Sequence, residues 1–554
     1  MTKSPRPVLF HGWENCEHER ASNSLSLVEA GSDIREKGGA VSATNQGSEV
    51  QSSRGQLRRK LRLWEAIALS FAILAPSLAV GLNGVLPASI VGEHVPFVFV
   101  LAFVGVGLVA YSFVRLSKYF THSGSVYALA GCTIGPRAGF FTGWALLGAY
   151  AAYAVDCVAA VALFGAAFLR ATGIWPSANW LLIALVAAGG TWILGYLDVR
   201  VVTRILLTIE GVSIALIVIV VVVIFARLAA GSAPQHQGFE LGPLLPGSVP
   251  WSALGLATVF GFLSFAGFEG AASLGEETRN PGKNIPRALV LSLVLMGVFY
   301  IVAMYAQTVG FGTSSAGVKA FATSGAPMGD LARAYVGRGM DDVLLLGVTI
   351  TSFSCAIGCT MGSARMLFAF GRDGFISTRL STTSARTGSP TTALAVVMTF
   401  VFVTTLALRL LAHATAIDDY FWLATIGTLA ILVAYLVTSA GGFKFLFIDG
   451  RRAPRWQGAI PLLGILFLVY VYWKNVSPVP AAPYNAFPYI VAAWLAAAVV
   501  IIAAYPGLAR RIGANLADEA GAGHGEDGLV SPDEARTAPA GDCTPGASSE
   551  TEAM

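Results

Sequence analysis

Runs of about 20 apolar residues recur along the chain, and they decide its fold class. Of the 554 residues, 55% are hydrophobic and only 12% are charged, whereas soluble domains carry about 25% charged residues. A helix satisfies its backbone hydrogen bonds internally, so an apolar run of this length can span a bilayer. The sequence therefore predicts an all-α polytopic membrane protein, and it gives no reason to expect a nucleic acid partner.

Twelve such segments can be marked, and we expect each to form a transmembrane helix. Their approximate ranges are 64–91, 95–116, 139–169, 179–197, 201–228, 251–276, 285–311, 342–371, 391–411, 421–447, 460–473 and 487–509. They divide the chain into a polar N-terminal tail at 1–53, a transmembrane domain at 54–510 and an acidic C-terminal tail at 511–554. Both tails are predicted to be disordered, because their composition offers little apolar surface to bury.

The positive charges predict the orientation, because cytoplasmic loops carry an excess of Lys and Arg. If the N-terminus is cytoplasmic, the basic cluster at 54–62 and most other Lys and Arg residues fall on the inner side. The outer side then holds only Arg170, Arg227, Lys319, Arg333, Arg338, Arg409 and Lys474. Both termini are therefore predicted to be cytoplasmic. The N-terminal tail has no apolar signal-peptide core, and the composition favours a bacterial-type plasma membrane protein.

Residues 264–288 read SFAGFEGAASLGEETRNPGKNIPRA and carry Gly267, Glu269 and Gly270 inside an apolar segment. A glycine costs a helix about 1 kcal/mol relative to alanine, and an ionisable group at membrane depth costs about 2.5 kcal/mol or more. A helix that opens at this point gives the glycines and the carboxylate a role, because its freed backbone groups and Glu269 can face a cavity. The alternative is a packed kink with Glu269 hydrogen-bonded to neighbouring helices.

The first segment has a comparable feature. It reads WEAIALSFAILAPSLAVGLNGVLP, and Pro76, followed by Ser77, interrupts it about a dozen residues from its start. Proline removes a backbone donor and clashes with the preceding turn. Inverted repeats place paired breaks in corresponding segments, so we expect broken helices one and six. The alternative for Pro76 is an ordinary proline kink, which membrane helices tolerate.

These residues resemble the amino acid–polyamine–organocation (APC) superfamily of secondary transporters. The stretch GFEGAASLGEETRNPGKNIPRA is similar to that family's sixth-helix signature, and SGSVYALAGCTIGPRAGFFTGW at 123–144 resembles its entry into helix three. The resemblance covers about residues 60–510. It implies a five-plus-five inverted-repeat core, with helices 1–5 at 64–228, helices 6–10 at 251–447 and peripheral helices 11–12 at 460–509. It implies no cofactor.

The resemblance also implies a substrate site. In the family, amides at the helix-one break hold a carboxylate, and carbonyls at the helix-six break hold an amine. Carried onto this chain, the two sets are Ala75, Pro76, Ser77, Leu78 and Ala79, and Phe265, Ala266, Gly267, Phe268 and Glu269. The turn A-P-S-L departs from the family's glycine-rich turn, and Pro76 offers no N–H. Amines and other organic cations therefore remain open beside amino acids.

Four further residues are candidates for coupling to an ion. Glu210 lies where some relatives carry a lysine for proton coupling, although it can equally be a structural carboxylate. Asp156 lies deep in helix three, where a carboxylate is presumed functional; it can bind a cationic substrate, carry a proton or bond the core. Ser352 and Ser354 lie where sodium-coupled relatives bind Na⁺, although serine is also a packing residue. A proton is favoured over sodium.

Six aromatic side chains can form gates or a cation–π wall, or can simply pack. They are Tyr150, Tyr153, Phe260, Phe268, Tyr420 and Trp422. The cysteines show no metal-ligand spacing, and Cys355 and Cys359 are interpreted as packing residues. The chain lacks a P-loop, a nucleophile elbow and a cofactor fingerprint, so no enzyme and no metal site are predicted. We expect a carrier of amino acids or related amines that works by alternating access, with proton symport favoured; an exchanger and a substrate-binding sensor remain alternatives.

Overall fold

The computed structural model describes residues 62–120, 125–196, 199–235, 238–274, 278–372, 376–384, 389–450 and 452–504. All of these residues belong to one compact unit of the chain, 57–554. The predicted tails at 1–53 and 511–554 lie outside the described residues. The described residues form helices and no β-strand, which confirms the all-α class.

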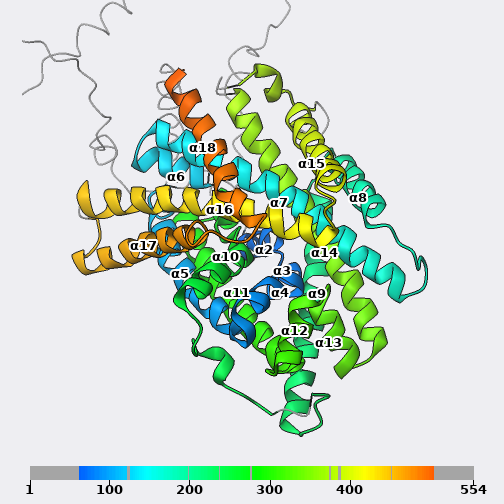
Figure 1. The fold of residues 1–554 in the computed structure, drawn as a ribbon. Coiled ribbons are helices and arrows are strands. Elements are labelled where there is room, and N and C mark those ends of the chain that lie inside the picture. Colours follow the sequence, from blue (N-terminus) through cyan, green and yellow to red (C-terminus); the bar gives the residue numbers. More distant parts are fainter. Residues whose placement is uncertain are drawn as a thin grey trace, which may run out of the picture. The chain divides into compact units, whose positions relative to one another are not determined.

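The helices follow one another along the chain (Figure 1). Up to residue 274 they are α2 (Leu63–Leu74), α3 (Pro76–Leu82), α4 (Val85–Val91), η1 (Gly92–His94), α5 (Val95–Leu116), α6 (Ser125–Thr133), α7 (Pro136–Ala171), α8 (Trp180–Gly195), α9 (Val199–Ala229), η2 (Gly242–Leu244), α10 (Trp251–Phe265) and η3 (Phe268–Leu274). The later ones are α11 (Pro281–Phe311), α12 (Ser315–Thr323), α13 (Pro327–Tyr335), α14 (Arg338–Arg372), η4 (Thr378–Ser381), α15 (Thr391–Leu411), α16 (Ala416–Phe443), η5 (Lys444–Ile448), η6 (Arg455–Gly458), α17 (Ala459–Lys474), η7 (Tyr484–Ala486) and α18 (Phe487–Ala504).

Ten stretches of the described chain are long and apolar enough to cross a membrane, which confirms a multi-pass membrane protein. That number treats 76–116 as one stretch, although it contains α3, α4 and α5, and it leaves out α8, which is apolar but shorter. Each predicted segment overlaps at least one helix. The number of twelve membrane helices and the inverted repeat stay predictions.

Helix α7 lies at the centre of the packing, and its most extensive contacts are with α14 and α16 (Figure 1). In its most apolar stretch 78% of the residues are buried, against 22% in the stretch that contains α18. The sequence of α7 is rich in Ala and Gly, and small side chains let helices approach closely in a membrane. Protein, rather than lipid, therefore surrounds most of α7.

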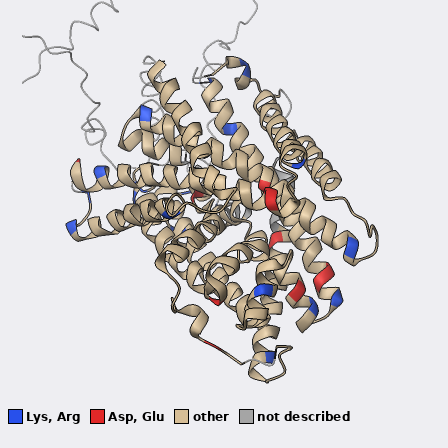
Figure 2. Cartoon of the chain, viewed as in Figure 1, with Lys and Arg blue, Asp and Glu red and all other residues tan. Residues whose placement is uncertain are grey.

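Large apolar side chains are exposed on the outer helices. Examples are Val186 on α8, Val222 on α9, Val403 on α15, Leu466 on α17 and Val500 on α18. Figure 2 shows that Lys and Arg are sparse across the helical body. An apolar surface of this extent needs a non-aqueous cover, and the hydrocarbon of a bilayer supplies it.

The connection between α11 and α14 contains two short helices that the apolar pattern does not predict. Ser314 caps α12 by accepting a hydrogen bond from the Gly317 amide at 3.2 Å. Helix α13 packs on α14. Arg333 of α13 forms an ion pair with the buried carboxylate of Asp341 of α14 at 2.8 Å. Each helix has only nine residues, too few to give a transmembrane pattern.

Candidate functional site

The first segment is interrupted at a single residue. Helix α2 ends at Leu74, Ala75 adopts left-handed angles (φ 42°, ψ 60°), and α3 begins at Pro76. Proline is well suited to the first helical position, because its missing N–H would have no intrahelical partner there. A non-glycine residue in the left-handed region costs about 1–3 kcal/mol and persists only where its surroundings enforce it. The surrounding structure therefore maintains the interruption, which lies within the predicted range of residues 75–79.

The second interruption follows α10. The helix ends at Phe265, Ala266 is extended (φ −61°, ψ 127°), and Gly267 has a φ of 100°. A Cβ atom at Gly267 would lie 2.4 Å from Cγ2 of Ile73, in the last turn of α2. Both the backbone angle and the close approach therefore require glycine, and the two breaks lie against each other.

The side chain of Ser70 joins the two interrupted segments. Its hydroxyl donates to the carbonyl of Phe268 at 3.5 Å and accepts from the amide of Ala271 at 3.1 Å. Ser70 lies on α2, and both partners lie in η3. The short helix after the second break is therefore anchored on the helix before the first break.

Glu269 is completely buried in η3, and three donors reach its carboxylate. Tyr150 of α7 donates to Oε1 at 3.0 Å. Tyr435 of α16 donates to Oε2 at 2.6 Å, and the Gly267 amide donates to the same oxygen at 3.1 Å. Such bonds offset much of the cost of burying a carboxylate. Glu269 thereby ties the second break to α7 and α16, as the packed alternative in the sequence analysis describes.

A cavity of about 40 Å³ lies beside the two breaks, with room for about three water molecules. Its walls come from α2, α3, α7, α10, α14 and α16 and the residues between them. They are Ile73, Leu74, Ala75, Leu78, Ala79, Asn83, Tyr150, Tyr153, Asp156, Cys157, Leu263, Ala266, Cys355, Cys359 and Tyr420. Among the described residues that line it, Asp156 is the one carboxylate and no Lys, Arg or His is present.

The predicted site residues divide between this wall and the packing behind it. Four residues of the two predicted break sets line the cavity: Ala75, Leu78, Ala79 and Ala266. The other six are buried nearby without being part of that lining: Pro76, Ser77, Phe265, Gly267, Phe268 and Glu269. The ring of Phe268 packs edge-on against Phe113 and Tyr435.

Asp156 is 3% exposed, and its Oδ1 atom has no hydrogen-bond partner. Asn83, which also lines the cavity, is fully bonded: its amide donates to Ser264 at 2.7 Å and its oxygen accepts from Tyr420 at 2.6 Å. The cavity therefore has one polar atom without a protein partner at Asp156. A cationic group is the partner that best offsets the cost of burying a carboxylate.

Comparison with known proteins identifies the family. The family model described as "Amino acid permease" matches residues 61–505. The chain belongs to the amino acid permease family. Its members are transporters, so this permease is a transporter and not an enzyme.

Several relatives support this membership. The low-affinity putrescine importer PlaP of Escherichia coli K12 is 26% identical over 330 residues, which cover 58% of this permease and 69% of the relative. The branched-chain amino acid permease BcaP of Bacillus subtilis is 26% identical over 443 residues, covering 76% and 89%. BcaP of Lactococcus lactis subsp. cremoris is 24% identical over 434 residues, covering 74% and 87%.

Glu210 lies on α9 of the permease and is 5% exposed. Its Oε1 atom accepts a hydrogen bond from the Ser77 amide at 2.9 Å. Because Ser77 is the second residue of α3, this carboxylate caps the first turn of that helix. The proton-coupling candidate therefore contacts the backbone of the broken segment, which the sequence alone cannot show.

The hydroxyl candidates on α14 are placed differently. The Ser352 hydroxyl donates to the Val348 carbonyl of its own helix at 2.7 Å, and Ser354 is half-buried. On α14, Cys355 reaches the first segment, where its thiol donates to the Ile73 carbonyl at 3.6 Å. From the sequence alone Cys355 is interpreted as a packing residue. Its place in the cavity wall depends on contacts between distant segments.

Removing one donor to Glu269 tests how firmly the second break is held. We expect Tyr435→Phe to destabilise the permease by about 1.5–3 kcal/mol, because a buried carboxylate oxygen loses a short hydrogen bond. The measurement is the melting temperature in detergent. Tyr111→Phe is the matched control, since Tyr111 bonds a neutral acceptor, Gln457, at a half-buried position. An equal loss in both variants would contradict a special role for Glu269.

Proposed function

We propose that this permease moves a small organic amine across the membrane by alternating access, driven by proton symport, with substrate bound between the two helix breaks. The observation that carries the proposal is the unpartnered Oδ1 of Asp156 in a cavity whose described lining has no cation. A protonated amine supplies the missing charge. The Tyr150, Tyr153 and Tyr420 side chains lie in the same wall, and aromatic faces attract ammonium groups.

The first break supports an amine over an amino acid. Pro76 has no amide hydrogen, the Ser77 amide is taken by Glu210 at 2.9 Å, and the Ala79 amide bonds the Ala75 carbonyl at 3.0 Å. A substrate carboxylate at this position would have to share the helix terminus with Glu210, and two carboxylates at one helix terminus repel each other. A substrate without a carboxylate avoids that competition. The relative PlaP is named a putrescine importer, which agrees with an amine substrate.

An amino acid is the second candidate. The family description and the names of both BcaP relatives favour it. In that case the substrate's amine would bind Asp156, and its carboxylate would replace Glu210 at the Ser77 amide. Such an exchange would link substrate binding directly to the protonation of Glu210.

Alternating access requires two sets of helices that move relative to each other. We infer that helices within 64–228 and 251–447 form the two halves of an inverted repeat, that helices within 460–509 are peripheral, and that the protein lies in the plasma membrane with both termini in the cytoplasm. The paired interruptions at Ala75 and Gly267 support this arrangement, because inverted repeats place broken helices in corresponding positions.

Uptake into proteoliposomes tests the proposal. Labelled putrescine, spermidine, leucine and valine would each be offered with an inward proton gradient, with a sodium gradient, or with internal unlabelled substrate only. We expect proton-driven accumulation of the amines. Accumulation of the amino acids alone would favour the second candidate. Uptake only against internal substrate would make the protein an exchanger, and saturable binding without uptake would make it a sensor.

Glu210→Gln tests the coupling step, because glutamine keeps an acceptor for the Ser77 amide but cannot carry a proton. We expect gradient-driven accumulation to fall by about 5- to 150-fold, the usual range for coupling between two sites. Equilibrium binding of the amine should change little. The matched control is Glu240→Gln, since Glu240 is exposed in a loop and bonds Thr313. Unchanged accumulation in the Glu210 variant would remove Glu210 from the mechanism.

A further inference from the structure

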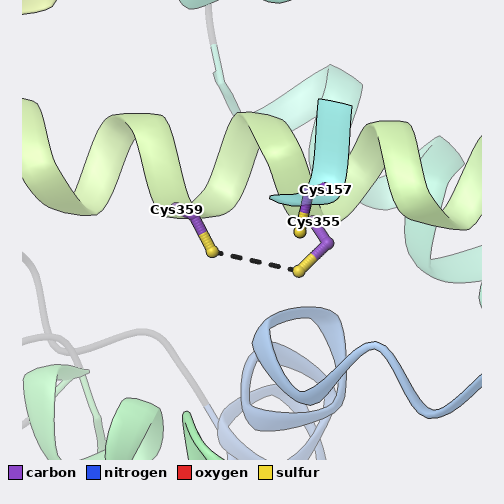
Figure 3. Close-up of side chains that lie close together, drawn as sticks. All are labelled: Cys157, Cys355 and Cys359. Atoms are coloured by element: carbon purple, nitrogen blue, oxygen red, sulfur yellow. Dashed lines mark hydrogen bonds between the residues drawn. The ribbon is translucent and has the colours of Figure 1, made fainter. Parts of the chain in front are cut away.

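Three cysteine sulfurs meet in the wall of the cavity (Figure 3). Cys157 comes from α7, and Cys355 and Cys359 come from α14, one helical turn apart. All three sulfur atoms lie within 4.8 Å of one another, and the Cys355 and Cys359 sulfurs are 3.9 Å apart. Each residue is buried, and none forms a disulfide.

This spacing fits a metal ion. Sulfurs bound to one ion at about 2.3 Å lie about 3.8–4.0 Å from each other in tetrahedral or trigonal geometry. The observed separations therefore need only small side-chain rotations to converge on one ion. Thiolates are soft ligands that select ions such as Cu(I) and Zn(II) over Mg²⁺ or Ca²⁺. We propose that Cys157, Cys355 and Cys359 form a binding site for one soft, thiophilic metal ion, and that its occupation closes the cavity to substrate.

The closure follows from what the ion would join and displace. An ion on the three sulfurs links α7 to α14 and occupies space beside Asp156 in the same wall. Each thiol binds as a thiolate and releases its proton to the solvent. Cys355 then no longer donates to the Ile73 carbonyl, two residues before the first break. The closure, unlike the binding, rests on the proposed transport function.

Metal binding can be tested in the full-length chain in detergent, with Cd²⁺ as the probe. A cluster-only variant carries Cys16→Ala, Cys132→Ala and Cys543→Ala. Its matched counterpart, the cluster-free variant, carries Cys157→Ala, Cys355→Ala and Cys359→Ala. We expect the cluster-only variant to bind one Cd²⁺ per chain with a thiolate-to-metal charge-transfer band in the ultraviolet. Adding Cys157→Ala to it should weaken binding by at least about 10- to 100-fold, because removing a ligand costs no less than losing a second-shell partner.

Equal Cd²⁺ binding by the cluster-free variant would overturn the proposal, as would binding without a thiolate band in the cluster-only variant. X-ray absorption spectroscopy of Cd²⁺-loaded wild-type protein identifies the metal ligands and so tests the site without any substitution. Three sulfur ligands at one ion are expected, and a shell of oxygen and nitrogen alone would overturn the site. Mg²⁺ serves as the hard-ion control and should produce no band.

Uptake then tests the closure separately. Cd²⁺ should abolish amine uptake by the cluster-only variant, a metal chelator should restore that uptake, and Mg²⁺ should leave it unchanged. If Cd²⁺ binds the sulfurs while uptake continues, the closure is wrong and the binding site stands. If no variant transports any amine, the proposed function fails, while the charge-transfer band still decides the metal site.

Discussion

Asp156→Asn is expected to weaken amine binding by about 30-fold or more, because truncating one partner of a buried charge pair costs about 2–5 kcal/mol. Asparagine has nearly the same shape, so the wall of the cavity is preserved while its one described carboxylate is lost. The measurement is the dissociation constant of labelled putrescine, by scintillation proximity on purified protein. The KM for uptake should rise in parallel.

Two further variants separate charge from packing in this prediction. Asp156→Glu keeps the charge and should recover part of the affinity. Asp342→Asn is the matched control, since Asp342 on α14 also has an unpartnered carboxylate oxygen but does not line the cavity. It should change the dissociation constant by no more than about twofold. An unchanged dissociation constant for putrescine in Asp156→Asn would contradict an amine site at Asp156.

Gly267→Ala is expected to destabilise the permease by about 2–6 kcal/mol. An alanine with φ near 100° is strained by about 1–3 kcal/mol. Its Cβ would also lie 2.4 Å from Cγ2 of Ile73, and overpacking of this kind costs about 1–3 kcal/mol more. The yield of monodisperse protein and its melting temperature measure the effect. The rate of uptake per folded molecule should also fall, because the displaced backbone lies next to the cavity.

The matched control is Gly358→Ala on α14, where an added Cβ meets nothing within 4 Å. It should be neutral or stabilising by up to about 1 kcal/mol, because alanine favours a helix. In an Ile73→Ala background, Gly267→Ala should cost less than in wild type, because the 2.4 Å contact with Cγ2 is gone, while the loss that comes from the backbone angle should remain. Equal losses at positions 267 and 358 would contradict the argument.

The breaks could be predicted from the sequence because their causes are local. Pro76 removes a donor within its own turn, and Gly267 with Glu269 disfavours a continuous lipid-facing helix wherever its neighbours lie. The membrane helices could be predicted for the same reason, since apolar length is a property of each segment alone. Asp156 could be singled out because a carboxylate at membrane depth is costly in any context.

The rest of the site depends on contacts between distant segments. Glu269 is held by tyrosines from α7 and α16, and no local pattern pairs these residues. Glu210 caps a helix 133 positions away in the chain. Cys355 and Cys359 are visible as neighbours on one helix, but Cys157 joins them only through the packing of α7 on α14. These partners are brought together by the tertiary structure, which cannot be read from a single sequence.

The hydroxyl of Ser70 has a kinetic consequence. It bonds two backbone groups that follow the second break, at Phe268 and Ala271, so bending either interrupted segment alone would break the bonds that join it to the other. We therefore expect both segments to move together, and under the proposed alternating access we expect the slow step to be their displacement against the tyrosines that hold Glu269. If the carrier alternates between inward- and outward-facing states as proposed, a weaker tyrosine bond should speed that conversion. A weaker Ser70 bond should let the two segments move independently and so permit substrate leakage without proton coupling.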